Sequence, residues 1–328
     1  MSVLLAVLLG TAGAELAAQG GAGTVSGVLR HGGPDGAPLA GRWVVLHQVT
    51  QGGGGPVDST RTDAGGRWRL RAAHVDTLAI YIASTLHDGL AYFSAPLHVQ
   101  AGKAAAADAL VVYDTSSGGP GIELQRRLVT IARAGTDGSR EVLELLELVH
   151  GGQTTRVAPD TIQPVWTGAI PAGAVQFEVQ TGDFSPDAVT QRGDSVLLFA
   201  PIQPGHSRQL SYRYVLPASG GTVVLPIDQP TTELDLLIED TSATVRAPGL
   251  TGGGVEQLES RRFAGYRADS VPAGAPVSIV FPAKQPFRTD RLLPIFVVVI
   301  VVVLGAGLWI ALKRKPETSD VGHQKKKH

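Results

Sequence analysis

TDAGGRWRLR, residues 62–71, joins a cluster of turn residues to a short candidate strand. Asp63, Gly65 and Gly66 belong to the residue types that favour turns, and Arg67–Arg71 follows them directly. Short runs of about five or six residues separated by turn clusters are typical of antiparallel β-sandwiches. The same pattern predicts further strands at Val25–Arg30, Arg42–Gln48, Thr77–Ile82 and Ala107–Tyr113.

Glycine-rich clusters separate these candidate strands. Residues 32–36 read GGPDG and residues 52–56 read GGGGP, in a chain of 328 residues with 41 Gly and 21 Pro. Neither cluster has the G-x-x-x-x-G-K-[ST] order of a phosphate-binding loop. We therefore expect both clusters to be turns between strands, and the Gly and Pro content argues against long soluble helices.

The first part of the chain also resembles a known family. The resemblance is carried by VSGVL at 25–29, PLAG at 38–41, VVL at 44–46 and TDAGGRWRL at 62–70. Residues 23–116 resemble a carboxypeptidase regulatory-like domain, a small transthyretin-like β-sandwich common in bacterial envelope proteins. The resemblance implies that Asp63 and the two glycines form a tight turn, that Trp68 enters the core, and that the domain is non-catalytic. The zinc peptidase sometimes fused to such domains is not expected, because the chain contains no H-x-x-E or H-E-x-x-H ligand set.

Residues 116–121, SSGGPG, predict a domain boundary. Beyond it, Ile122–Ala132 and Arg140–His150 are expected to form a hairpin around Asp137-Gly138. The alternative for the second segment is a helix capped by Ser139, and we favour a strand because the neighbouring segments also read as β. More strands are expected at Thr222–Pro226, Leu234–Glu239, Ala243–Ala247 and Val277–Phe281.

Residues 171–217 resemble the second β-domain of bacterial membrane-anchored envelope proteins. The motifs are PAGA at 171–174, PIQPG at 201–205 and LSYRYVLP at 210–217. The resemblance implies a second β-sandwich region at residues 121–283, as one large sandwich or two small ones. The sequence therefore predicts an all-β protein of two antiparallel β-sandwich domains, with three as the alternative, plus one C-terminal transmembrane helix.

Residues 1–19 resemble a secretory signal peptide. Val3–Leu9 is a run of seven apolar residues, and Ala12-Gly13-Ala14 offers a small-residue cleavage site. No Lys or Arg precedes the apolar run, which departs from the usual pattern, and a buried N-terminal strand is the alternative. A cleaved leader would export the body of the protein.

Residues 292–312 predict a transmembrane helix, because 21 uncharged residues at about 1.5 Å each cover roughly 30 Å. In the tail, residues 313–328, six Lys or Arg stand against two acidic residues, which predicts a cytoplasmic tail. We therefore expect a single-pass protein of the bacterial inner (cytoplasmic) membrane with a large periplasmic part. Gly305, Gly307 and Ala311 are small residues that suit close packing against the helix of another integral-membrane subunit.

The sequence contains few residues that could form a catalytic or metal-binding site. The absence of Cys excludes disulfides and thiolate metal sites, and a formal net charge of −1 gives no electrostatic footprint for nucleic acid. No two histidines of the exported body lie within five residues of each other, so no metal, cofactor or catalytic residue is predicted. His87 with Asp88 could meet His98 across a hairpin, but a structural or surface histidine is favoured. For Glu141, Glu144 and Glu147 we favour a solvated face over an acid pair.

Tyr92 and Trp166 are the candidate ligand or partner aromatics, although core packing explains most aromatic residues of this chain. Taken together, the sequence predicts a non-catalytic accessory or scaffold subunit of a larger membrane complex, with a respiratory or photosynthetic electron-transfer assembly as the first candidate. The alternative is an envelope carbohydrate- or peptidoglycan-binding module. An enzyme with an unrecognised Ser or Asp site is the third hypothesis.

Overall fold

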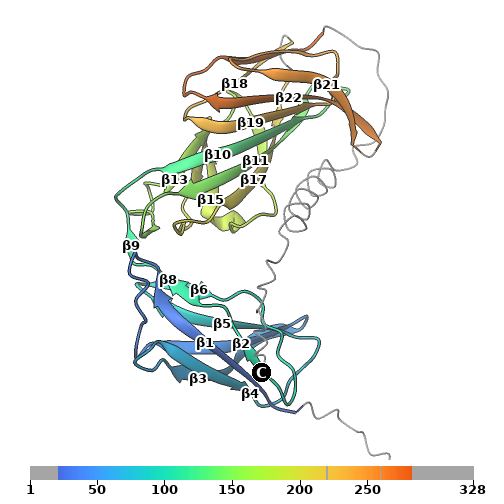
Figure 1. Cartoon of the computed structure of the whole chain (residues 1–328). Helices are drawn as coiled ribbons and strands as arrows, with labels where there is room; N and C mark the ends of the chain where they lie inside the picture. Colours follow the sequence, from blue (N-terminus) through green and yellow to red (C-terminus); the bar gives the residue numbers. More distant parts are fainter. Residues whose placement is uncertain (1–20, 219–220, 259, 283–328) are drawn as a thin grey trace, which may run out of the picture. The chain divides into compact units, whose positions relative to one another are not determined.

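The computed structural model describes residues 21–218, 221–258 and 260–282 (Figure 1). They form 23 β-strands and one short 3-10 helix, η1 (Pro186–Ala188), and the described ranges contain no α-helix. Contacts divide the chain into an N-terminal unit, residues 21–116 with 152–155, and a C-terminal unit made of residues 117–151 and the chain from 156 onward. The all-β prediction is confirmed. The predicted signal peptide, transmembrane helix and basic tail lie outside the described residues.

The N-terminal unit is a sandwich of two four-stranded sheets. One sheet has the order β4-β1-β7, with β8 also paired to β1, and the other has the order β3-β2-β5-β6. A single core takes buried residues from both sheets, including Trp68 of β4 and Tyr81 of β5. The strands are β1 (Gly23–His31), β2 (Trp43–Thr50), β3 (Gly53–Arg61), β4 (Arg67–Ala72), β5 (Ile80–His87), β6 (Leu90–Phe93), β7 (Ala104–Ala106) and β8 (Leu110–Val112).

The turn between β3 and β4 has the geometry that the family resemblance implies. Asp63 Oδ1 accepts hydrogen bonds from the backbone N–H groups of Gly65 and Arg67, at 2.9 and 2.8 Å. Gly66 has a φ of +71°, and a Cβ there would lie 2.4 Å from the carbonyl oxygen of Leu29. Trp68 is buried. Both expectations, a tight turn and a tryptophan in the core, are confirmed.

The glycine cluster at residues 52–56 is mostly strand, not turn as we expected. β3 begins at Gly53 and pairs with β2 from there, with Pro56 opposite His47. The cluster can pair because β3 is an edge strand, where a proline that cannot donate a hydrogen bond is tolerated. The strand expected at Thr77–Ile82 begins only at Ile80 and continues to His87.

The C-terminal unit is built on a seven-stranded sheet of order β14-β17-β11-β10-β19-β22-β21. Two three-stranded sheets, β13-β16-β15 and β18-β23-β20, contribute to the same hydrophobic core. Most buried apolar residues of this unit belong to that core, and a smaller cluster of Leu128, Ala132, Leu143 and Leu145 is separate from it. The strands of this unit's three sheets are β10 (Ile122–Ile131), β11 (Arg140–His150), β13 (Trp166–Ala169), β14 (Val175–Val179), β15 (Val189–Arg192), β16 (Ser195–Leu198), β17 (Arg208–Leu216), β18 (Thr222–Leu225), β19 (Thr231–Ile238), β20 (Thr244–Arg246), β21 (Thr251–Leu258), β22 (Arg261–Val271) and β23 (Val277–Val280). Two further short strands, β9 (Thr115–Ser116) and β12 (Thr155–Arg156), pair with each other.

Strand pairing differs in one respect from the expected antiparallel sandwich. The β10–β11 hairpin is antiparallel as predicted, so the helical alternative from Ser139 is wrong. However, β1 runs parallel to β7 and β8, and β10 runs parallel to β19. Parallel neighbours need a long crossover connection. Between β1 and β7 the chain forms all four strands of the other sheet, together with β4.

A buried ion pair lies at the centre of the C-terminal unit. Arg127 and Glu144 are 2% and 0% exposed and make two hydrogen bonds, from Nε at 2.8 Å and Nη2 at 3.0 Å. Tyr214 and Tyr212 donate their hydroxyls to the same carboxylate, at 2.7 and 3.3 Å. Other N–H groups of the Arg127 guanidinium donate hydrogen bonds to the carbonyl oxygens of Pro226 and Ala169. The network thus ties the large sheet to backbone outside it.

Glu144 is buried, so the expectation that Glu141, Glu144 and Glu147 form one solvated face is wrong. Side chains alternate along a strand, so on β11 Glu144 points to the side opposite Glu141 and Glu147. That side is the core, and burial followed by the charge of Glu144 raises the pKa of Tyr212 and of Tyr214 well above the usual value. Both tyrosines therefore remain protonated donors to the carboxylate.

The close approach of Gly27 to Trp68 gives a first prediction. A Cβ at Gly27 would lie 2.4 Å from Cζ2 of the buried Trp68 ring, whereas a Cβ at Gly55 would meet no atom within 4 Å. We expect Gly27→Ala to lower the free energy of unfolding by about 1–3 kcal/mol because the indole must shift. Gly55→Ala should change it by less than about 0.5 kcal/mol. Chemical denaturation of the full chain measures both, and equal effects would contradict the packing described.

The buried pair gives a second prediction. Glu144→Gln should lower the free energy of unfolding by about 3–5 kcal/mol, because Arg127 keeps its charge without a counter-ion. The control is Glu141→Gln, which removes a partly exposed pair with Arg213 at 2.9 Å and should cost less than about 1 kcal/mol. Denaturation followed by circular dichroism separates the two. A cost below about 1 kcal/mol for Glu144→Gln would show that the pair is dispensable.

Candidate functional site

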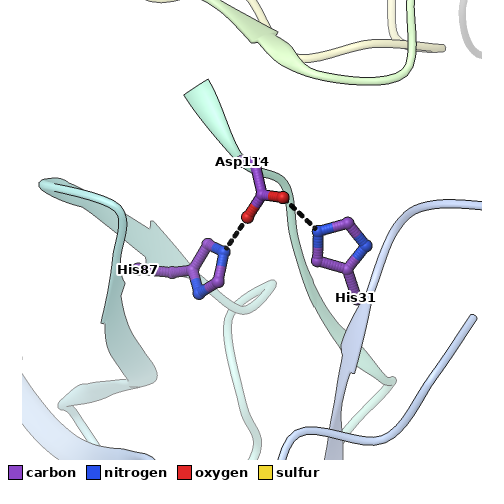
Figure 2. Close-up of side chains that lie close together, drawn as sticks. All are labelled: His31, His87 and Asp114. Carbon is purple, nitrogen blue, oxygen red and sulfur yellow. Dashed lines mark hydrogen bonds and ion pairs between the residues drawn. The ribbon is translucent and has the colours of Figure 1, made fainter. Parts of the chain in front are cut away.

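Two histidines converge on one aspartate in the N-terminal unit (Figure 2). His31 is the last residue of β1, His87 is the last residue of β5, and Asp114 follows β8. His87 Nε2 lies 2.8 Å from Asp114 Oδ1, and His31 Nε2 lies 3.3 Å from Asp114 Oδ2. The three residues form what we call the His–Asp–His cluster.

The contacts of the two imidazole rings differ, and at His31 they show which ring nitrogen carries the hydrogen. The backbone N–H of Gly33 donates to Nδ1 of His31 at 3.1 Å, so Nδ1 carries no hydrogen and Nε2 donates to Asp114. His87 is 9% exposed, and its Nδ1 is buried without a hydrogen-bond partner among the described residues. Asp114 is 60% exposed and is the open side of the cluster.

The backbone around Asp114 is held on both sides. Thr115 donates its N–H and its hydroxyl to Asp88 Oδ2, both at 2.7 Å, and these bonds lower the pKa of Asp88. Tyr92 donates its hydroxyl to the carbonyl oxygen of Tyr113 at 2.7 Å. The hydrogen bond from His87, above all, lowers the pKa of Asp114 below its ordinary value near 3.8. The carboxylate is therefore ionised and fixed in place.

A second feature of the same unit is an exposed apolar surface on the sheet β3-β2-β5-β6. Val45 of β2, Ser84 of β5 and Phe93 of β6 lie side by side in register, so they share a face. Leu86 lies two residues beyond Ser84 on that face. Large apolar side chains with at least half of their surface exposed gather there: Trp43 at 53%, Ile80 at 50%, Phe93 at 63% and Leu86 at 68%. We call these four residues the apolar face.

A charged surface lies on β1 and β4 of the opposite sheet and on β3, an edge strand of the first sheet. A depression of about 680 Å³ is lined by residues of β1, β3 and β4. Arg69 lies on β4 between the buried Trp68 and Leu70, so it points away from the core. The arginines in the lining are Arg30, Arg61, Arg67 and Arg69, with Asp63 as the acidic residue. The charged surface extends to Arg61 of β3, whose guanidinium also lies over Trp43 of the apolar face.

The structure buries both aromatics that the sequence suggested for ligand contacts. Tyr92 is 2% exposed and Trp166 is 5% exposed. The Trp166 indole donates Nε1–H to Gln229 at 2.9 Å, and its ring lies over Gly168. Inward strand positions put both rings in the core, so the proposal of these two as ligand or partner aromatics is wrong.

The residues that the sequence analysis missed are long-range neighbours. His31, His87 and Asp114 are separated by 56 and 27 positions, so no local spacing marks them. His87 meets His31, not the exposed His98 as considered. The helix-packing residues Gly305, Gly307 and Ala311 lie outside the described residues. Within the described part, no helix is long and apolar enough to cross a membrane.

No family model matches the chain, and no curated protein matches it either. Among solved structures, an M1 zinc metallopeptidase from Deinococcus radiodurans is 12% identical, with a TM-score of 0.34 over 50% of this chain and 43% of that one. A mutant of that enzyme bound to a Tyr-Ser-Ala substrate gives 11% identity and the same TM-score, over 50% and 44%. The chain matches less than half of the length of these enzymes. A similarity of this size assigns neither fold nor activity.

The His–Asp–His cluster predicts a pH dependence of stability. The pKa of Asp114 is lower in the folded chain than in the unfolded chain, so its ionised form stabilises the fold. Its contribution to the free energy of unfolding is fully present above about pH 4–5 and is lost as the pH falls through the pKa of the folded state. At neutral pH, Asp114→Asn should lower the free energy of unfolding by up to about 1 kcal/mol, since the group is largely exposed. The difference from wild type should shrink below pH 4. Asp35→Asn, at an exposed turn, is the control and should show no such trend. A difference that stays constant from pH 7 to pH 3 would contradict this account.

Proposed function

We propose that this chain is a non-catalytic, membrane-tethered subunit that docks on another membrane protein of the bacterial envelope through the apolar face. The observation that carries the proposal is the exposure of Trp43, Ile80, Leu86 and Phe93 on one sheet. Large apolar side chains exposed together on one face mark interaction sites on soluble domains. Aromatic residues are enriched in the cores of protein–protein interfaces.

The composition of the apolar face favours a protein partner over a glycan. Ile80 and Leu86 are aliphatic and offer no hydrogen bonds to sugar hydroxyls. The Arg61 guanidinium lies 4.8 Å from the centre of the Trp43 ring and covers part of it. His47 and Ser84, on the same sheet, bond to each other at 2.7 Å. A flat surface with few free polar groups suits the apolar surface of another protein.

The proposed topology follows from the two ends of the sequence. A signal peptide at residues 1–19 would export the sandwich units, and a helix at residues 292–312 would anchor them with the basic tail inside. The carboxypeptidase regulatory-like resemblance of residues 23–116 supports a non-catalytic role in the bacterial envelope. Docking would then occur on the periplasmic side of the inner membrane, and an electron-transfer assembly, respiratory or photosynthetic, is the first partner to test.

Extraction of the native membrane in mild detergent, followed by sizing and mass spectrometry, tests the proposal. We expect the wild-type chain to migrate with one membrane complex in a fixed ratio. The double variant Leu86→Ser with Phe93→Ser should migrate without it, because apolar contact area is lost. Arg69→Ser, on the opposite sheet, is the matched control and should keep the partner.

Two outcomes would overturn the proposal. Migration of the wild-type chain alone would exclude a stable complex, and retention of the partner by the double variant would exclude the apolar face as the contact. Retention of the wild-type chain on purified peptidoglycan, lost in Trp43→Ala, would favour the carbohydrate-binding alternative instead. Trp43, Leu86 and Phe93 are more than half exposed and Arg69 is exposed, so the variants should fold like the wild type.

A further inference from the structure

We infer that His31, His87 and Asp114 bind a divalent transition metal ion of the zinc type. The inference does not depend on the proposed docking function. All three ligand atoms lie within 4.8 Å of one another. In a tetrahedral zinc site with bonds of about 2.0–2.1 Å, ligand atoms are about 3.4 Å apart. The Nε2 atoms of His31 and His87 lie 3.3 and 2.8 Å from the two different oxygens of the Asp114 carboxylate, so small side-chain movements would give one oxygen and both nitrogens that spacing.

The donor set selects the class of metal. Two imidazole nitrogens and one carboxylate oxygen suit zinc and its neighbours in the transition series, whereas calcium and magnesium prefer oxygen ligands. The chain contains no Cys, so no thiolate competes for the ion. Three protein ligands would leave a fourth position for water. Because Asp114 is the exposed member, that position would face solvent.

The ligands are held by rigid elements, as a binding site requires. His31 and His87 close strands β1 and β5, whose other residues are paired within the sheets. Asp114 lies between Tyr113 and Thr115, and both neighbours are hydrogen-bonded to side chains of the same unit, Tyr92 and Asp88. Metal binding would therefore require only small movements of the side chains.

Metal binding needs a change of tautomer at both rings. In the metal-free chain, each Nε2 faces Asp114, and His31 carries its hydrogen there because Gly33 donates to Nδ1. With an ion bound at Nε2, the ring hydrogen of each imidazole must lie on Nδ1. The Gly33 N–H then loses its acceptor. His31 is 27% exposed, so water can replace that bond.

Titration with Zn²⁺ alone tests the inference. The protein is the full chain in mild detergent, carrying His323→Gln and His328→Gln, because the tail histidines could bind zinc themselves. We expect one zinc ion per chain with a Kd in the micromolar range or tighter. His31→Ala, His87→Ala and Asp114→Ala should each weaken binding at least tenfold. His98→Ala, at an exposed histidine outside the cluster, should leave it unchanged.

Cobalt binding provides a second measurement. A His–Asp–His cluster that only stabilised the fold would not give the cobalt signal. Co²⁺ in a four-coordinate site gives strong visible absorption bands, which added Zn²⁺ should abolish and His31→Ala should prevent. If the buried His87→Ala variant fails to fold by circular dichroism, the partly exposed His31 variant decides. Absence of stoichiometric zinc binding, or binding that survives His31→Ala and Asp114→Ala, would overturn the inference.

Discussion

Side chains on a β-strand point alternately to its two faces, and this constraint determines what each segment of the chain buries and exposes. On β11 the alternation places Glu144 in the core, where Arg127 and two tyrosines satisfy its carboxylate. On β5 and β6 it places Leu86 and Phe93 outside while Tyr92 points inward. The buried network and the apolar face are therefore products of the same geometry.

Residues at the ends of strands can meet residues from distant segments of the chain. A strand end is fixed in position by the sheet, yet its last side chain is near solvent and can meet residues from distant segments. His31 and His87 occupy such positions and meet Asp114 there. The N-terminal unit thus combines an exposed apolar surface, for which we propose a partner protein, with a polar cluster, for which we propose a metal ion. The two features use different residues and can act independently.

Local patterns in the sequence predict much of the fold. The family resemblance implies the turn at Asp63 and the burial of Trp68, and the β10–β11 hairpin follows from residue types within a few positions. The strand at Gly53 and the burial of Glu144 do not, because they depend on edge position and on strand alternation. The His–Asp–His cluster could not be predicted at all, since sheet topology brings its three members together. Apolar strand residues such as Tyr92 and Phe93 look alike until the topology shows which one faces the core.

We propose that the apolar face contacts another membrane protein. Site-specific photocrosslinking in intact cells tests it most directly, with a benzophenone side chain in place of Phe93 and, as the control, in place of Arg69 on the opposite sheet. We expect one discrete crosslinked product from position 93 and none from position 69. No product from position 93, or the same product from both positions, would contradict it.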